Sequence, residues 1–235
     1  MRPWHVCVLI PARDEEDLVS RCLHSVLEAK KALGKPATAD VVLVVDNSTD
    51  RTSELAKDLI GRHGTVLQAN AGCVGTARCL AARLALARYG GPLDRCWLAN
   101  TDADSVVPVD WFTRQLEFAE QGVHVVAGTV NVDNFDEHGS DVPRRFRQSY
   151  EIASDGSHGH VHGANLGFRA DMYVRAGGWG HLSTAEDHDL WGRLKAVNAV
   201  TRSTNSLEVI TSGRRQGRAP HGFADALAAH NEVRT

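Results

Sequence analysis

Residues 96–104 read CWLANTDAD, a short, mostly apolar run followed at once by two aspartates one residue apart. A run of this kind, Cys96–Asn100, is typical of a strand buried on both faces of a sheet. Asp102 lies just past its carboxyl end, and Asp104 follows it. Two carboxylates in such a turn can point towards one place, and their oxygens suit hard cations such as Mg²⁺ or Mn²⁺. A solvated turn would carry the same residues, so the flanking sequence must decide.

The sequence upstream repeats this strand pattern with helices in between. Apolar, partly β-branched runs at residues 6–10, 41–45 and 65–68 alternate with segments of helical period. This order predicts an α/β fold with a mostly parallel sheet flanked by helices. Acid-rich segments follow three of the strands, at residues 11–16, 46–50 and 100–105. Ligands of such sheets bind beyond the carboxyl ends of the strands, so these segments mark the expected site.

The pattern changes after residue 105. In chain order we expect a helix from Pro108 to Gly122, a strand at 123–130, a polar loop at 131–160 with one helix near 143–153, a glycine-rich segment at 161–183, a helix at about 186–197 and strand-like pieces at 200–211. No flexible linker separates these elements. We therefore expect a single domain over residues 1–235, with a nucleotide-binding half at 1–105 and an acceptor and catalytic half at 106–220.

The composition disfavours some classes of binding partner and some locations in the cell. The formal net charge is −3, which leaves no broad basic surface and disfavours nucleic acid. No apolar run reaches the roughly 18 residues needed to cross a bilayer. The five cysteines are odd in number and form no CxxC pair, which indicates reduced thiols in the core. From these features we expect a cytoplasmic protein without a transmembrane segment.

Several side chains at the strand ends are candidates for binding a nucleotide. Asp46 ends the second strand, where its carboxylate can accept hydrogen bonds from a base or a ribose, whereas helix capping is expected of Asp50. Arg78 opens a helix after two glycines and can contact a phosphate or a base, or lie on the surface. Glu15 and Glu16 either serve the site or only complement a helix dipole.

Four of these features, in this order, resemble glycosyltransferase family 2, whose members have the GT-A fold. They are PARDEE after the first strand, VDNSTD after the second, GCVGTAR (residues 72–78) opening a helix and DAD after the fourth. The resemblance covers about residues 5–220. It implies a Rossmann-like GT-A domain in which Pro11, Ala12, Asp14 and Asp46 bind the nucleoside and Arg78 lies close by. It also implies that Asp102 contacts the sugar and ribose, and that Asp104 is the more direct metal ligand.

The second half of the chain extends the resemblance. Glu186-Asp187 at the start of a helix is similar to the family's Glu-Asp pair, which implies that Asp187 is the catalytic base and that Glu186 orients the acceptor or a loop. Gly163 and Ala164 are similar to a segment that lines the donor-sugar pocket. His221 stands where related enzymes place a third metal ligand, and the pair His160 and His162 competes for that role.

Two further features bear on the chemistry. The basic segment with Arg214, Arg215 and Arg218 can close over a diphosphate. Trp179 either stacks on a sugar or packs in the core. The chain lacks the Gln-x-x-Arg-Trp motif of the family's processive synthases, so a processive synthase is not expected.

The resulting prediction is a glycosyltransferase that uses Mg²⁺ or Mn²⁺ and a UDP-, GDP- or dTDP-sugar donor, with inversion implied by the resemblance. The acceptor would be a small molecule, a lipid or a glycan. A retaining GT-A enzyme shares the aspartates and stays an alternative. A sugar nucleotidyltransferase would need a basic, glycine-rich loop after the first strand, but residues 11–16 are acidic, which argues against it. A non-catalytic module that only binds a nucleotide sugar would not need a catalytic base and metal ligands, so the presence of both argues against that reading. The nucleotide base, the sugar, the acceptor and the oligomeric state do not follow from the sequence.

Overall fold

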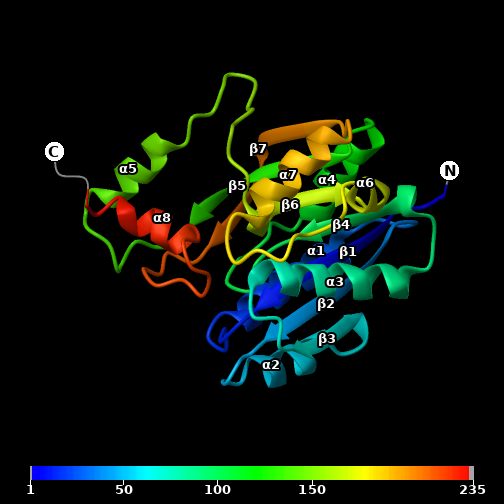
Figure 1. Cartoon of the computed structure of the whole chain (residues 1–235), viewed down its shortest axis with the longest axis horizontal. Coiled ribbons are helices and arrows are strands. Elements are labelled where there is room, and N and C mark those ends of the chain that lie inside the picture. The colour runs from blue at the N-terminus through cyan, green and yellow to red at the C-terminus, as the bar shows by residue number, and fades with distance from the viewer. Residues whose placement is uncertain (1, 233–235) are drawn as a thin grey trace.

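The computed structural model describes residues 2–232, which form one seven-stranded sheet in the order β3-β2-β1-β4-β6-β5-β7 (Figure 1). The strands are β1 (His5–Ala12), β2 (Thr38–Asp46), β3 (Gly64–Ala69), β4 (Cys96–Asn100), β5 (Val125–Val132), β6 (Leu166–Arg169) and β7 (Thr201–Thr211). Only β6 runs antiparallel to its neighbours β4 and β5, and the other paired strands are parallel. The predicted mixed, mostly parallel α/β sheet is confirmed.

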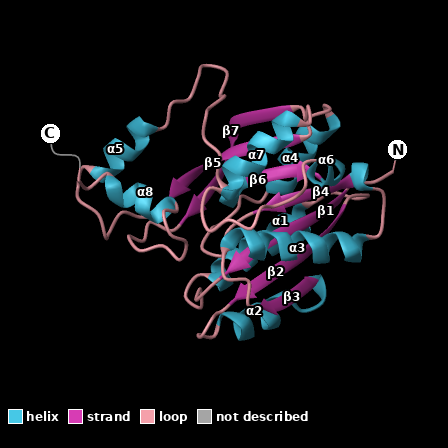
Figure 2. Cartoon of the chain, viewed as in Figure 1, coloured by secondary structure: helices cyan, strands magenta, loops and turns pink. Residues whose placement is uncertain are grey.

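Helices cover both faces of this sheet (Figure 2). They are α1 (Val19–Ala32), α2 (Thr52–Ile60), α3 (Val74–Tyr89), α4 (Trp111–Glu120), α5 (Val142–Ser149), α6 (Ala170–Arg175), α7 (Glu186–Ala196) and α8 (Phe223–Ala229). Helices α1, α2 and α4 pack on one face, and α3, α6 and α7 pack on the other. The result is a three-layer α/β/α domain.

The sequence of the central strands explains this layering. Successive side chains of a strand point to opposite faces. Val6, Val8 and Ile10 of β1 accordingly join the core beneath α1, and Cys7 and Leu9 join the core beneath α3. A strand covered on both sides must be apolar at every position, which is why these strands read as continuous apolar runs.

Three elements were not expected from the sequence, and one expected helix is shorter than predicted. The glycine-rich segment 161–183 contains β6 and α6, and the basic tail is followed by α8. The helix expected near residues 143–153 ends earlier, at Ser149. Strand β6 has four residues and α6 has six, which is too short for a periodic pattern to emerge.

The carboxyl ends of β1, β2, β4, β5 and β7 meet at one edge of the sheet because these strands run in the same direction. Beyond this edge α5 and α8 lie together, away from the sheet (Figure 1). Val142 and Phe146 of α5 pack there against Leu227 of α8 in a small separate core. None of the helices within residues 2–232 combines the length and hydropathy that crossing a membrane requires.

Candidate active site

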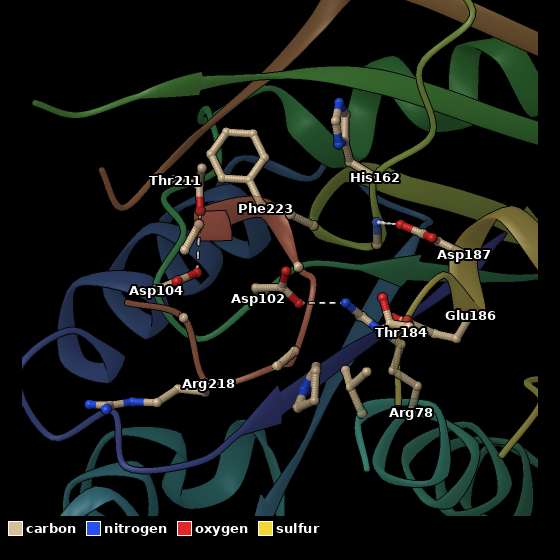
Figure 3. Close-up of a pocket in the computed structure, with 18 of the residues that line it drawn as sticks. Arg78, Asp102, Asp104, His162, Thr184, Glu186, Asp187, Thr211, Arg218 and Phe223 are labelled. Carbon is tan, nitrogen blue, oxygen red and sulfur yellow. Dashed lines mark hydrogen bonds and ion pairs between the residues drawn. The ribbon is translucent and has the colours of Figure 1, made fainter. Parts of the chain in front are cut away.

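A cavity of about 560 Å³ opens at the edge where the strands end (Figure 3). Its walls come from the residues after β1, β2, β4 and β7, from the first turns of α3 and α7, and from α8. Segments far apart in the sequence therefore meet here, as expected at the carboxyl edge of a parallel sheet.

Asp46 closes β2 on one wall of the cavity and is 4% exposed. Its Oδ1 accepts the backbone N–H groups of Ala71 at 2.7 Å and Gly72 at 3.1 Å, just before α3. Its Oδ2 accepts a hydrogen bond from Nη2 of Arg13 at 2.9 Å. Asp46 thus ties the loop before α3 to the sheet, and Arg13 neutralises its charge.

Asp14 does not line this cavity. Its backbone has a φ of 49°, and its carboxylate accepts the N–H of Thr49 at 2.8 Å. The carboxylate of Asp14, which was predicted to bind the nucleoside, therefore points to the turn after β2. Glu15, the next residue, lines the cavity instead. Asp50 accepts the N–H of Thr52, the first residue of α2, at 3.0 Å, but the N-cap position itself is Arg51, which makes no side-chain capping bond, so Asp50 holds the start of α2 from the residue before the cap.

Arg78 of α3 lies at the centre of a buried charge network (Figure 3). Its Nη2 donates to Oδ1 of Asp102 at 2.5 Å, and its Nε donates to Oε1 of Glu186 at 3.1 Å. The Arg78 side chain is only 2% exposed, and its guanidinium stands 5.4 Å from the centre of the Trp179 ring. Arg78 therefore joins the end of β4 to the start of α7 rather than lying on the surface.

The pKa values in this network follow from burial and charge. Burial lowers the pKa of Arg78, but the carboxylates of Asp102, Glu186 and Asp187 raise it by more. The net result is a pKa above the ordinary arginine value. Burial raises the pKa of Glu186, and Arg78 opposes part of that rise. The guanidinium thus holds a charge that its partners stabilise.

Asp104 points away from Arg78, towards Thr211 at the end of β7 (Figure 3). Its Oδ1 accepts the hydroxyls of Ser105 and Thr211, both at 3.3 Å, and its Oδ2 accepts Nη2 of Arg214 at 2.7 Å. The Asp104 side chain is 14% exposed. Burial raises its pKa, and Arg214 works in the opposite direction.

Asp187 lines the cavity at the start of α7. Its Oδ2 accepts the backbone N–H of Gly163 at 2.8 Å, and its Oδ1 accepts the N–H of His188 at 2.8 Å. A Cβ atom at Gly163 would collide with Nη2 of Arg78, so only glycine fits. The Gly163-Ala164 turn is thus held between Arg78 and Asp187, and both turn residues line the cavity.

Histidines form the wall towards α5 and α8. The hydroxyl of Tyr150 and Nε2 of His162 form a 2.7 Å hydrogen bond, and His160 stacks on the Tyr150 ring at 4.3 Å. Burial lowers the pKa of His162 to about 3, so its ring is neutral at physiological pH. His221 lines the cavity too, and its backbone carbonyl accepts the hydroxyl of Thr184.

The site's chemistry fits a divalent cation in part. Asp102 and Asp104 offer oxygen ligands, which Mg²⁺ and Mn²⁺ prefer. Within residues 2–232, however, no three His, Cys, Asp or Glu side chains gather closely enough to hold a metal ion. The structure therefore does not assemble His221, His160 or His162 with the aspartates. A cation held by one or two carboxylates takes its other ligands from phosphates and water.

Most of the predicted site residues come together in this cavity. They are Pro11, Ala12, Asp46, Arg78, Asp102, Asp104, Gly163, Ala164, Glu186, Asp187, Arg214, Arg218 and His221. Asp14 and Arg215 are not among its lining residues. Trp179 is 3% exposed and packs edge-on against Phe168, so it belongs to the core.

Sequence reasoning missed several residues of the walls, among them Arg13, Thr211 and Phe223. Arg13 stands inside the PARDEE segment, directly after the first strand, and Asp46 ends the second. Because neighbouring parallel strands end at the same edge, Arg13 could have been proposed as a partner for Asp46. Thr211 and Phe223 carry no such signal, because their place depends on how the chain turns between β7 and α8.

Comparisons with known proteins agree with this architecture. One curated relative, undecaprenyl-phosphate 4-deoxy-4-formamido-L-arabinose transferase of Edwardsiella ictaluri (strain 93-146), is 30% identical over 131 residues. The match covers 56% of this chain and 38% of that protein, so the chain spans well under half of its relative.

Two solved structures share the fold. Residues 1–349 of S. aureus TarS in complex with UDP give a TM-score of 0.65 at 16% identity, covering 90% of this chain and 61% of that one. The mannosyltransferase PcManGT from Pyrobaculum calidifontis, in complex with GDP-Man and Mn²⁺, gives 0.67 at 18% identity, covering 98% and 70%. At these identities the likeness establishes the fold.

The family follows from the sequence model that the chain matches. Residues 7–175 match the model described as Glycosyl transferase family 2, which is more than half of the chain. This span runs from within β1 to the end of α6 and includes Asp46 at the end of β2 and Asp102 just after β4. The chain is therefore a member of glycosyl transferase family 2 with a GT-A fold.

Proposed function

We propose that the chain transfers a sugar from a nucleotide-diphosphate donor to an acceptor hydroxyl, with a divalent cation and with inversion at the anomeric carbon. One observation carries the proposal. Asp102 and Asp104 line one side of a single cavity, and Asp187 lines the other (Figure 3). A donor lying between them would have its diphosphate near the first two carboxylates and its sugar near the third.

The donor half of the cavity supplies groups that suit a nucleotide. Pro11, Ala12 and Asp46 surround the space assigned to the nucleoside, and Arg218 stands near the space assigned to the diphosphate. Arg218 is exposed, and its guanidinium donates to the backbone carbonyl of Asp14 at 2.8 Å. An exposed guanidinium with a single backbone partner can exchange that partner for a phosphate, with which it forms stronger, charge-assisted hydrogen bonds.

Asp104 is the residue proposed to hold the cation, and Asp102 the one that contacts the donor sugar or ribose. A bound divalent cation would neutralise the charge that develops on the departing diphosphate. Asp102 is already held by Arg78, which leaves its second oxygen for a donor hydroxyl. The Mn²⁺ in the structure of the mannosyltransferase PcManGT supports the use of a divalent cation.

The transfer step follows from the place of Asp187. The acceptor oxygen attacks the anomeric carbon from the face opposite the diphosphate, while Asp187 takes the hydroxyl proton. The bond from the anomeric carbon to the phosphate oxygen breaks, and its electron pair leaves with the diphosphate. Two backbone N–H groups orient the Asp187 carboxylate for this role. Arg78 hydrogen-bonds both Asp102, next to the proposed cation ligand, and Glu186, next to the proposed base. It thereby links the cation side of the cavity to the side of the base.

The donors to examine first follow from the named relatives. One solved neighbour binds UDP and another binds GDP-Man, and the curated relative acts on a lipid phosphate by its name. UDP- and GDP-sugars, followed by dTDP-sugars, are therefore the proposed donor classes. Lipids, glycans and small molecules are the proposed acceptor classes.

The test is a donor-turnover assay. Purified protein is incubated with UDP-, GDP- and dTDP-sugars and MnCl₂ or MgCl₂, and release of nucleoside diphosphate is measured with water as the acceptor. We expect turnover of one donor class, and we expect EDTA to abolish it. Asp104→Ala should lose turnover, whereas Asp94→Ala, which alters an exposed aspartate outside the cavity, should retain it. Undiminished turnover in EDTA or in Asp104→Ala would remove the metal from the proposal.

A further inference from the structure

One guanidinium occupies the place where two carboxylates of the donor site converge. Nη2 of Arg214 donates to Oε1 of Glu15 and to Oδ2 of Asp104, each at 2.7 Å. Nη1 of Arg214 donates to the other oxygen of Glu15 at 2.8 Å. The side chains of Arg214, Glu15 and Asp104 are 19%, 6% and 14% exposed. A largely desolvated positive charge therefore lies between two acidic groups.

The charges in this corner do not balance. Glu15 and Asp104 bring two negative charges, and Arg214 brings one positive charge. The neighbouring Asp102 is paired with Arg78, which is almost fully buried and has no room to leave. These three side chains therefore carry a net charge of −1 among themselves, which the more distant Arg218 lessens at Glu15, and a divalent cation matches two carboxylates better than a single positive charge does.

A cation at Asp104 and the present position of Arg214 exclude each other. Both need Oδ2 of Asp104, and two positive charges sharing one oxygen repel strongly in a desolvated site. Arg214 lies in the segment between β7 and α8, outside any helix or strand. Asp104 retains the hydroxyls of Ser105 and Thr211 when that guanidinium moves.

We propose that Arg214 is a positioning residue that fills the cation site of the free chain and exchanges with the divalent cation when a donor binds. In the exchanged state the guanidinium pairs with the donor diphosphate, for which arginine forks are well suited. Glu15 holds Arg214 in the free state and faces the cation after the exchange. This inference rests on the proposed function of the site.

The exchange has a thermodynamic consequence. A cation that binds alone must displace Arg214 without offering it a new partner, so it binds weakly. A cation that binds with a nucleoside diphosphate offers Arg214 the phosphate oxygens, so it binds tightly. Cation and nucleotide binding are therefore coupled through Arg214, and such couplings are reciprocal.

Mn²⁺ binding measured by electron paramagnetic resonance tests the coupling without any turnover. Free Mn²⁺ is titrated with wild-type protein, Arg214→Met and Arg62→Met, each alone and with UDP, GDP or dTDP. Without nucleotide, Arg214→Met should bind Mn²⁺ roughly tenfold more tightly than wild type, and its gain on adding nucleotide should shrink. Arg62→Met removes the same charge from an exposed residue outside the cavity lining and should behave as wild type.

The outcomes separate this inference from the proposed function. If wild type binds Mn²⁺ with a nucleotide but Arg214→Met binds Mn²⁺ no more tightly than wild type, the exchange is wrong and the proposed function stands. Equal tightening in Arg62→Met would also overturn the exchange, because net charge alone would explain it. If wild type binds no Mn²⁺ with any nucleotide, both fail. Should Arg214→Met not fold, Arg214→Lys, whose ammonium cannot form the fork, is expected to tighten Mn²⁺ binding in the same direction.

Discussion

Gly163 shows how much of the site depends on single residues. Its N–H donates to Asp187, and the space where a side chain would begin is filled by the guanidinium of Arg78. The sequence indicated a small residue near a sugar. It could not indicate that the neighbour is a buried arginine, because Arg78 is 85 positions away in the chain.

We expect Gly163→Ala to destabilise the fold. The added methyl must displace a guanidinium that is fixed by Asp102 and Glu186, and overpacking of this kind costs about 1–3 kcal/mol. Thermal and urea unfolding measure the change. Gly159→Ala is the matched control, because a Cβ at Gly159 meets open space. Equal stability of the two variants would show that Arg78 yields easily.

His162 is expected to make stability depend on pH. Its folded-state pKa is lowered to about 3, chiefly by burial and then by the nearby His160, His158 and His188. Above pH 6.5 the ring is neutral in both states, and between 6.5 and 3 only the unfolded state gains the proton. The His162 contribution to stability is therefore complete above pH 6.5 and declines as the pH falls.

Replacing His162 separates its contribution to the pH dependence of stability from the contribution of the buried carboxyl groups. Burial raises the pKa of Glu15, Asp104 and Glu186, so these carboxyls act in the opposite direction on acidification. The difference in unfolding free energy between wild type and His162→Gln should shrink from pH 7 to pH 5. His24→Gln, at an exposed position of α1, should show no such trend. A constant difference for His162→Gln would contradict the burial of a neutral ring.

At the scale of elements, the sequence predicted the strands whose apolar runs are continuous. Strand β4 has the expected bounds, and β1 and β2 extend the expected runs by a few residues. It did not predict β6, α6 or α8, because short elements are specified by their tertiary partners. Strand β6 exists because Leu166 and Phe168 fit between β4 and β5 in antiparallel register.

The contact between α3 and α7 is expected to depend on Arg78. Arg78→Met fills a similar volume but leaves Asp102 and Glu186 without their counter-charge. Breaking a buried ion pair from one side costs about 3–5 kcal/mol. Chemical unfolding measures this loss. The double variant Arg78→Met/Glu186→Gln should recover part of it, because an amide needs no counter-ion. No recovery in the double variant would show that the packing of Arg78 matters more than its charge.

At the scale of the whole molecule, the sheet explains why a site could be predicted at all. Parallel strands place their carboxyl ends at one edge, so the acid-rich segments after β1, β2 and β4 had to meet. The order of these segments also sufficed to suggest the family. The pairing of each acid with an arginine did not follow from the sequence, because Arg13, Arg78 and Arg214 come from three different segments.

The walls of the cavity also differ in how well the sequence predicts them. Its donor side is built by elements with a strong sequence pattern. The side towards α5 and α8 is built by loops and a small separate core around Phe146. Loops of this kind vary with the ligand they bind, which is why the acceptor class cannot be derived from the strands.

The most direct test compares wild type with Asp187→Asn in the presence of Mn²⁺ and the donor found by the turnover screen. Donor affinity is measured by calorimetry and sugar release by single-turnover kinetics. We predict unchanged donor affinity and a rate lowered by about 10²–10⁴-fold, the usual contribution of a general base. Asp189→Asn, two residues along α7 and outside the cavity lining, should keep the wild-type rate. An Asp187→Asn protein that binds the donor and releases sugar at the wild-type rate would contradict the proposed mechanism.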